Sequence, residues 1–420
     1  MEYKRIEKQN YKLNVINTDR FKTNLITFYF TKEYKDEELV YFDYLSYLIT
    51  YSSKKYNSKI KLAKYLEELY LCSVFSSTSS KGKNIRFVVD LEYINSKYTE
   101  ADMDKKSIDL LFEILFNPDV NDGKFTHENF ELAKKTLIKK ARMREENANI
   151  YASDRFRSLF YKETCLEKTY VSVEEYERVT SKEVYEFYKN LINENLIVNL
   201  LGDYKDDSVL NYLEGKLNKL ENKNKFLDEV YLENKIKNKV LFKEENKDFS
   251  QSHLYMGYKF KDLTDFEKHY VAPITSAIFG NGTNSILFKI VREKNGLCYT
   301  INSSVNRFNN SLVVYAGINK KDAIKAIDLI KKCLKDMEKM NLEENLSKVK
   351  SLITTSLNTF YDDMGGISEY FYLKNFDNVE AINVRKEKFD KVTVEDVKQL
   401  LTKIKLDTIY LLKGEKEWKK

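Results

Sequence analysis

The feature that most restricts the fold is a sequence pattern that occurs in both halves of the chain. Thr180 lies three residues before Glu183 and precedes an amphipathic stretch, a short apolar run and a glycine. Thr393 lies three residues before Asp396 and precedes the same succession. A threonine and an acidic residue at this spacing form a helix N-cap, because each side chain satisfies a free backbone amide of the other. We therefore expect a helix followed by a strand at both places.

The two copies lie 213 residues apart. A second pair of similar segments, Ile108–Leu111 and Ile327–Ile330, has an offset of 219 residues. A similar offset and the same order favour a duplicated α+β domain over chance matches. The length of 420 residues agrees, because it exceeds one ordinary hydrophobic core. We expect domains at 1–215 and 248–420, joined by a Lys/Asn/Glu-rich linker at 216–247.

Hydrophobic periodicity predicts the elements of the first half. Alternating or short apolar runs indicate strands, and a spacing of three to four residues indicates helices. The expected strands are 12–16, 25–30, 74–79, 85–93 and 196–201, and the expected helices are 40–51, 60–70, 108–116, 128–144 and 184–191. Strands and helices are mixed without strict alternation, which is typical of an α+β fold.

Composition excludes several classes of protein. Lys plus Arg (71) nearly balance Asp plus Glu (65), so the net charge of +6 gives no indication of nucleic-acid binding. No run reaches the roughly 18 apolar residues needed to span a membrane. Four cysteines without metal-ligand or disulfide-framework spacing indicate thiols in a reducing compartment, so we expect a cytoplasmic protein. These cysteines are Cys72, Cys165, Cys298 and Cys333.

The most specific local pattern lies in the second half. Phe279-Gly-Asn-Gly282 is followed by an apolar helical stretch and then by Val291-Arg-Glu-Lys-Asn-Gly-Leu-Cys-Tyr299. This segment resembles the C-terminal-domain signature of the insulinase-like M16 peptidases, in which a glycine-rich turn and a helix lead into R-E-K-x-G-L-x-Y. The segments Lys64–Tyr70 and Phe130-Glu131 also fit the layout of that family.

The resemblance covers nearly the whole chain and implies a fold and a partner. The fold would be two tandem homologous α/β domains of the LuxS/mitochondrial-processing-peptidase-like metallohydrolase type. Family members pack such a pair against a second subunit around a peptide chamber. The chain is similar to zinc-less M16B subunits, some linked to bacteriocin maturation and others to modification of elongation factor P. A heterodimer with a catalytic M16 subunit, acting on a peptide, is therefore implied.

The residues that the family uses for zinc are missing. Active members carry H-x-x-E-H on the first helix, where two histidines four apart share one face and bind zinc. The resemblance places this motif at Asp43-Tyr-Leu-Ser46-Tyr47 and a third ligand, a glutamate, near Ala133. We therefore expect no metal in this chain, with zinc in the partner subunit.

The histidine inventory supports this expectation without any alignment. Only His127, His253 and His269 occur, and no two of them are four residues apart. A helical two-histidine zinc site is thus excluded, although a site assembled from distant segments is not. The ordinary interpretation is that His127 starts a helix and that the other two are polar groups of the surface or the core.

Arg292 and Tyr299 are the candidate catalytic residues that the resemblance leaves. In the family an arginine and a tyrosine of this segment reach toward the zinc site, and in split enzymes the zinc-less subunit supplies them. A guanidinium and a phenol can both donate hydrogen bonds to a peptide oxygen. The alternatives are a surface ion pair for Arg292 and a core role for Tyr299. Gly280, Gly282 and Gly296 are expected to form turns.

Two functions from different classes remain open. The first is a pseudopeptidase subunit that closes the chamber and lends Arg292 and Tyr299 to hydrolysis by its partner. The second is a catalytically inert scaffold or adaptor that binds peptides with the same fold. In either case an extended peptide would add a strand to an exposed sheet edge.

Overall fold

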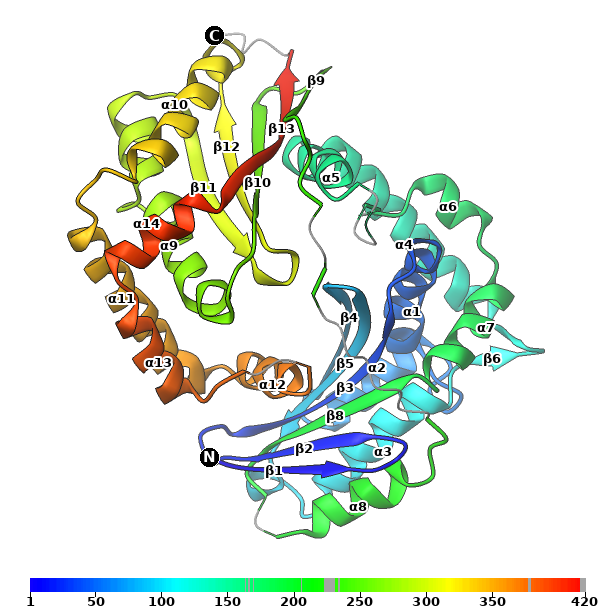
Figure 1. The fold of residues 1–420 in the computed structure, drawn as a ribbon. Helices are drawn as coiled ribbons and strands as arrows, with labels where there is room; N and C mark the ends of the chain where they lie inside the picture. Colours follow the sequence, from blue (N-terminus) through cyan, green and yellow to red (C-terminus); the bar gives the residue numbers. More distant parts are fainter. Residues whose placement is uncertain are drawn as a thin grey trace. The chain divides into compact units, whose positions relative to one another are not determined.

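The computed structural model describes residues 1–162, 164, 167–168, 170–204, 206–222, 231–232, 235–376 and 379–415. The chain forms two compact units, and each takes a segment from the other half of the sequence. Unit 1 comprises Met1–Arg142, Val171–Val230 and Phe360–Val379, and unit 2 comprises Met143–Tyr170, Tyr231–Thr359 and Glu380–Lys420. Figure 1 shows the two units with the chain coloured from end to end.

Unit 1 is built on a sheet with the strand order β1-β2-β8-β3-β5-β4. Its strands are β1 (Glu2–Glu7), β2 (Lys12–Asn17), β3 (Thr23–Glu33), β4 (Ser73–Lys81), β5 (Asn84–Ile94) and β8 (Asn195–Gly202). Only β2 and β8 pair in parallel. Every residue of β8 is buried, as expected of a central strand covered on both faces.

Helices cover the two faces of this sheet. Its helices are α1 (Leu39–Tyr51), α2 (Lys59–Glu68), α3 (Met103–Phe116), α6 (Val173–Arg178), α7 (Ser181–Leu191), α8 (Ser208–Leu217) and α12 (Met364–Leu373), and α4 (His127–Glu146) begins here; β6 (Val120–Asn121) pairs with β7 (Lys124–Phe125). Ser76 on β4 donates a hydrogen bond to the carbonyl of Ser46 on α1. Tyr29 on β3 instead bonds Ser368 on α12, so α1 and α12 lie on opposite faces.

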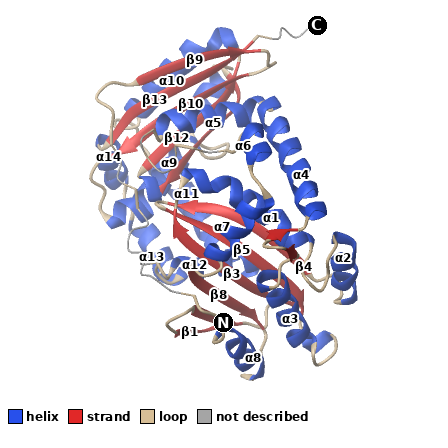
Figure 2. Cartoon of the chain, turned by 90° about the vertical axis from the view of Figure 1, so that its right-hand side faces the viewer, coloured by secondary structure: helices blue, strands red, loops and turns tan. Residues whose placement is uncertain are grey.

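Unit 2 has a sheet with the order β11-β12-β10-β13-β9. The strands are β9 (Leu241–Lys247), β10 (Ser252–Phe260), β11 (Cys298–Asn306), β12 (Ser311–Ile318) and β13 (Ile404–Gly414), and the helices are α5 (Ala148–Phe160), α9 (Ala272–Gly280), α10 (Ala323–Asp336), α11 (Glu343–Asn358), α13 (Ile382–Lys391) and α14 (Val394–Thr402). Phe156 and Phe160 of α5 pack in one apolar cluster with Tyr255 of β10 and Tyr410 of β13. Figure 2 shows the helices and strands by type.

The two sheets share one topology, which confirms the expected α+β fold. β2-β8-β3-β5-β4 of unit 1 corresponds to β9-β13-β10-β12-β11 of unit 2, with the single parallel pair at the same position. Both predicted capping boxes are present: Thr180 caps α7 with Glu183, and Thr393 caps α14 with Asp396. The elements predicted for the first half also form, with ends that differ by at most a few residues.

The expected domains, 1–215 and 248–420, are continuous in sequence, whereas each unit of the structure includes a segment from the other half of the chain. Residues 143–170 belong to unit 2, and residues 360–379 belong to unit 1. The expected linker 216–247 contains the end of α8 and the whole of β9, which pairs with β13. Residues 223–230 and 233–234 of that linker lie outside the described residues. The strand was missed because Leu241–Lys247 has four charged residues and little apolar periodicity.

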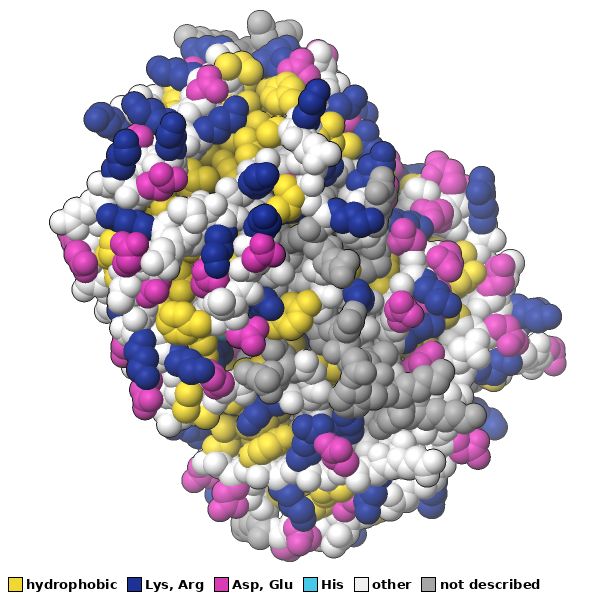
Figure 3. Space-filling view, viewed as in Figure 1, with side chains coloured by type: hydrophobic (Ala, Val, Ile, Leu, Met, Phe, Trp, Pro, Cys, Tyr) yellow, Lys and Arg dark blue, Asp and Glu magenta, His cyan; other side chains and the backbone are white. Residues whose placement is uncertain are grey.

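The surface agrees with the near balance of charges. On the face shown in Figure 3, Lys and Arg side chains are interspersed with Asp and Glu. Such a mixed face does not form the single-sign basic stripe typical of nucleic-acid binding. Among the described helices, none combines the length and hydrophobicity that crossing a membrane requires.

Candidate functional site

The positions aligned with the zinc motif lie on α1, where the side chains of Asp43 and Ser46 are hydrogen-bonded. The Asp43 carboxylate accepts a hydrogen bond from the Tyr176 hydroxyl of α6. Ser46 Oγ donates to the carbonyl of Phe42 one turn earlier, at 3.0 Å. The ring of Tyr47 lies edge-on to Tyr51, with ring centroids 5.5 Å apart. Neither of the positions aligned with the two histidines, Asp43 and Tyr47, carries an imidazole.

Aromatic packing fills the space between α1 and α4. The Tyr44 ring stacks on the Phe130 ring with centroids 4.8 Å apart and an interplanar angle of 8°. The Tyr44 hydroxyl donates to the carbonyl of Tyr176 at 2.7 Å. Ala133, the position aligned with the third ligand, is fully buried and has no donor atom. These residues do not fit a zinc ion, because a metal needs several converging N, O or S donors.

The three histidines do not supply a metal site either. His127 is the first residue of α4, as expected, and His269 Nε2 lies 3.4 Å from the Tyr231 hydroxyl. His253 is buried in β10, where its Nδ1 lies 3.0 Å from the Tyr315 hydroxyl. Burial lowers the pKa of His253 to about 4. Over the described part of the chain, no three His, Cys, Asp or Glu side chains gather as a metal cluster would.

The segment of unit 2 that carries the M16-like pattern, Phe279 to Tyr299, contains a π-helical turn, and we refer to it as the motif segment. α9 ends at Gly280, and residues Phe288–Lys294 form a π-helix before β11 begins at Cys298. Gly282 and Gly296 have φ angles of +82° and +61°, which other residues adopt only with strain. Gly280 is needed for a different reason, since a Cβ there would lie 2.8 Å from Ser303 Oγ. π-Helical turns are rare and often lie at functional sites.

Arg292 and Tyr299 are both exposed at this segment. Arg292 lies over the ring of Phe288, with its guanidinium carbon 4.5 Å from the centroid. Within the described residues it forms no ion pair, so the surface-pair alternative does not account for it. Tyr299 is 61% exposed and is not a core residue, and its hydroxyl donates to Asn319 Oδ1 at 3.0 Å. Both side chains are therefore accessible to another molecule.

Sequence reasoning missed a groove in unit 1. A pocket of about 340 Å³ lies between α12 and the strands β3, β5 and β4. It is lined by Leu25, Tyr29, Ser73, Phe75, Ser77, Arg86, Val88, Asp90, Glu92, Met364, Gly365, Ser368 and Glu369. The strand residues alternate along β4 and β5, so they share one face of the sheet. We refer to this pocket as the β4 groove.

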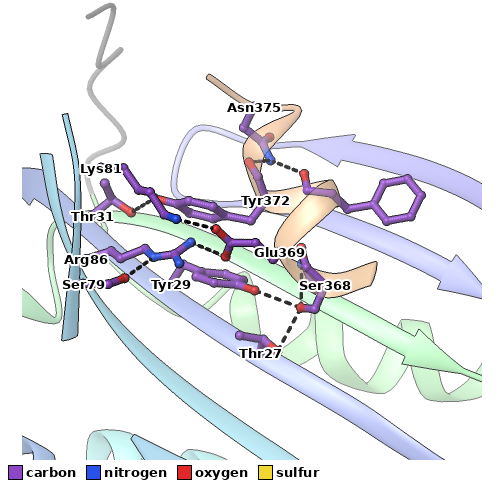
Figure 4. A network of polar contacts seen from close by, with 12 residues as sticks. Thr27, Tyr29, Thr31, Ser79, Lys81, Arg86, Ser368, Glu369, Tyr372 and Asn375 are labelled. Carbon is purple, nitrogen blue, oxygen red and sulfur yellow. Dashed lines mark hydrogen bonds and ion pairs between the residues drawn. The ribbon is translucent and has the colours of Figure 1, made fainter. Parts of the chain in front are cut away.

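A charged and aromatic network forms one wall of the β4 groove (Figure 4). Arg86 is 8% exposed, and its Nη1 lies 2.7 Å from Glu369 Oε2, while Lys81 Nζ lies 3.0 Å from the other carboxylate oxygen. The Arg86 guanidinium also lies over the Tyr372 ring, 4.4 Å from its centroid. The only sequence signal for Arg86 was that a charged residue interrupts the apolar run Ile85–Leu91. Nothing in the sequence indicated its partner Glu369 on α12.

The carboxylates of the groove differ in their electrostatic surroundings. Burial raises the pKa of Glu369, but the charges and hydrogen bonds of Arg86 and Lys81 outweigh that effect and lower it. Burial raises the pKa of Asp90, and its hydrogen bond from Thr27 Oγ1 at 2.7 Å only partly offsets the effect. Glu369 is thus a fully paired carboxylate, whereas Asp90 has no cation within ion-pair distance in the described structure.

Comparison with known protein families and sequences places these features in context. Residues 178–352 match the family described as "Peptidase M16 inactive domain". The chain is 25% identical over 412 residues to a probable inactive metalloprotease, YmfF, of Bacillus subtilis strain 168, covering 96% of this chain and 95% of that protein. It is 24% identical over 340 residues to a non-peptidase homolog, YmxG, of Helicobacter pylori, covering 73% and 75%.

A solved structure has the same fold from end to end. A conserved protein from Enterococcus faecalis V583 superimposes with a TM-score of 0.91 at 22% identity, covering 99% of both chains. At that identity the likeness shows the fold alone. The two sequence relatives are named as a probable inactive metalloprotease and a non-peptidase homolog. These names agree with the aromatic packing at Tyr44 and with the lack of a donor atom at Ala133.

Proposed function

We propose that this chain is a non-catalytic member of the insulinase-like M16 peptidase family and forms one subunit of a two-subunit peptidase, as its similarity to the inactive M16 domain and to two relatives with non-peptidase names supports. Its partner would be an M16 chain that carries H-x-x-E-H. In this arrangement the present chain helps to enclose a peptide and supplies hydrogen-bond donors to the reaction. The bond-breaking machinery belongs to the partner.

The observation that carries the proposal is a contrast between two places in the chain. The zinc-motif positions on α1 carry no histidine, and the neighbouring Tyr44 ring stacks on Phe130 where a third ligand would approach from α4. The motif segment of unit 2 instead presents Arg292 and Tyr299 at the surface. An exposed tyrosine, and an exposed arginine with no ion pair among the described residues, give little to the stability of this chain, so both fit a role toward a second molecule.

The two side chains suit the chemistry of peptide hydrolysis. The carbonyl oxygen of the cleaved bond gains negative charge as the bond is attacked, and donors that meet it there lower the barrier. The Tyr299 hydroxyl can turn from Asn319 to donate to that oxygen. The Arg292 guanidinium offers fixed donors to a neighbouring carbonyl or carboxylate of the peptide.

The test is reconstitution of the chain with an H-x-x-E-H-bearing relative from the same genome, followed by a peptide-cleavage assay. Tyr299→Phe removes only the hydroxyl and should lower kcat on the order of a hundredfold, the usual cost of one oxyanion donor. Arg292→Lys keeps the charge but loses the planar donors and should lower turnover less than Arg292→Ala. Tyr98→Phe, at a tyrosine 51% exposed in unit 1, is the matched control.

The second candidate function is an inert peptide-binding scaffold. The β4 groove favours it, because a concave site at a sheet edge can hold a peptide without any chemistry. If Tyr299→Phe and Arg292→Ala both keep full turnover in a normally assembled pair, the assisting role is excluded and the scaffold stands. Light scattering on each variant pair shows whether assembly is normal.

A further inference from the structure

The β4 groove lies at an open edge of the sheet of unit 1. Among the described strands, β4 pairs only with β5. Alternate residues of an edge strand direct their N–H and C=O groups away from the sheet, where another strand can bond them. Edges are usually protected by charges or proline, but β4 has the sequence Ser-Val-Phe-Ser-Ser-Thr-Ser-Ser before its only charge, Lys81. This edge is therefore suited to accept a strand.

On β4, small side chains lie on either side of Phe75, and the one opposite Glu92 leaves that carboxylate accessible. Ser73 and Ser77 line the groove from β4, opposite Glu92 and Val88 of β5. Asp90 lies between those two β5 residues, faces the same side and is directly opposite Phe75, whose side chain is 60% exposed. A serine side chain ends at the hydroxyl on its Cβ, so Ser73 does not cover the Glu92 carboxylate, and a long side chain reaches Asp90 along the Phe75 ring.

The charges of the groove are not balanced. Three carboxylates line it or its wall, and the two nearby cations, Arg86 and Lys81, both pair with Glu369. Asp90 and Glu92 accept hydrogen bonds from Thr27 and Thr23 respectively, and neither has a cation within ion-pair distance in the described structure. Three carboxylates against two cations leave one excess negative charge, which lies at Asp90 and Glu92 and is only partly offset at Asp90 by the more distant Arg86 charge. This excess favours a cationic group in the groove and disfavours an anionic one.

We propose that the β4 groove binds an extended peptide segment that pairs with β4 and directs a lysine or arginine side chain toward Asp90 and Glu92. This rests on the proposed function, since it names the class of peptide that the same protein would take. A strand added to β4 would lie about 5 Å beyond it and roughly 10 Å from β5. Among charged side chains, lysine and arginine have the long flexible stems that cross such a distance. Phe75, 60% exposed at the groove, provides apolar surface for such a stem.

The net charge of the whole chain opposes the binding of a basic peptide, so it cannot by itself produce the proposed preference. The protein carries +6, so its overall field repels a basic peptide. A preference for a basic residue over a neutral one of equal length must then come from a local site.

The experiment measures binding of fluorescent decapeptides to the purified full chain by anisotropy at pH 8, a high pH chosen because burial raises the pKa of Asp90. The peptides differ at one central residue: lysine, norleucine or glutamate. We expect the lysine peptide to bind about tenfold more tightly than the norleucine peptide, the effect of one partly shielded ion pair. The glutamate peptide should bind most weakly.

Two variants separate the parts of the site. Asp90→Asn with Glu92→Gln should abolish the lysine preference and leave norleucine binding unchanged, because the amide oxygen introduced at position 90 can still accept the bond from Thr27. Counted from the two-residue turn between β4 and β5, the N–H of Thr78 points away from β5, so Thr78→Pro should weaken all three peptides. Asp265→Asn, at a carboxylate 90% exposed in unit 2, should behave like the wild type.

Several outcomes would overturn the proposal. They are equal binding of lysine and norleucine peptides, a preference that survives the double substitution, or no binding of any peptide. A dimer that Thr78→Pro dissolves would show instead that β4 pairs with a second copy of the chain. The binding test involves neither a partner nor cleavage, so its failure would not exclude the role of Arg292 and Tyr299. Failure of the reconstitution test would likewise not exclude peptide binding at the β4 groove.

Discussion

Arg86 and Glu369 form an ion pair of 2.7 Å although one lies in the first quarter of the chain and the other near its end. The pair joins β5 to α12 within unit 1, and the nearly buried guanidinium lies over the Tyr372 ring. Holding α12 on this sheet creates the wall of the β4 groove. The pair therefore links the stability of unit 1 to the shape of its candidate binding site.

Removing the carboxylate of this pair should destabilise the protein strongly. Glu369→Ala leaves the Arg86 charge buried without its carboxylate, and we expect a loss of about 3 kcal/mol in the free energy of unfolding. The double variant Arg86→Met with Glu369→Leu should lose less, because no charge is then left unpaired. Urea titration followed by circular dichroism measures both. Glu338→Ala, at an exposed glutamate, is the control, and a Glu369→Ala curve equal to it would contradict the prediction.

The packing that replaces a metal site should behave as ordinary core. Tyr44→Phe keeps the stack on Phe130 but loses the hydrogen bond to the carbonyl of Tyr176, which should cost about 1 kcal/mol. Tyr44→Ala also removes the ring, and the cavity should raise the cost to about 3 to 5 kcal/mol. Equal stability of the two variants, measured by denaturant titration, would show that the ring does not pack as described.

Purified chain should not retain zinc. Asp43 is bonded to Tyr176, and Ala133 has no donor atom, so the positions aligned with the family's ligands cannot coordinate an ion. After incubation with zinc and gel filtration, elemental analysis should find far less than one ion per chain. The H-x-x-E-H-bearing relative, treated in the same way, serves as the positive control. A stoichiometric ion together with chelator-sensitive peptide cleavage by the chain alone would refute both this prediction and the proposed function.

Stability should fall in mild acid because of one buried histidine. The pKa of His253 is lowered by burial from 6.5 to about 4, so the unfolded chain takes up this proton first as the pH decreases. The contribution is present above pH 6.5 and is lost between about pH 6.5 and 4, with a total on the order of 3 kcal/mol. His253→Gln should flatten that part of the stability profile, whereas His127→Gln, at an exposed position, should not. A wild-type slope in His253→Gln would disprove the assignment.

Local patterns were sufficient for many elements of the fold. The threonine caps at Thr180 and Thr393 bond only residues three positions away, so sequence alone predicts them. The same holds for the helix containing Tyr44 and for the glycines at positions 282 and 296, whose positive φ angles reflect a local turn. The absence of two histidines four residues apart is likewise a property of the sequence, which no folding can change.

Tertiary structure alone decided which segments meet. Nothing near Glu369 in sequence indicates that α12 packs on a strand formed by residues 84–94, because the contact depends on how distant segments come together and not on periodicity. The exchange of residues 143–170 and 360–379 between the units follows from the same cause, and so does the position of β4 at the end of the described strand order. Sequence thus determined the elements and the missing ligands, whereas long-range packing determined the groove, since burial and pairing are properties of the folded chain.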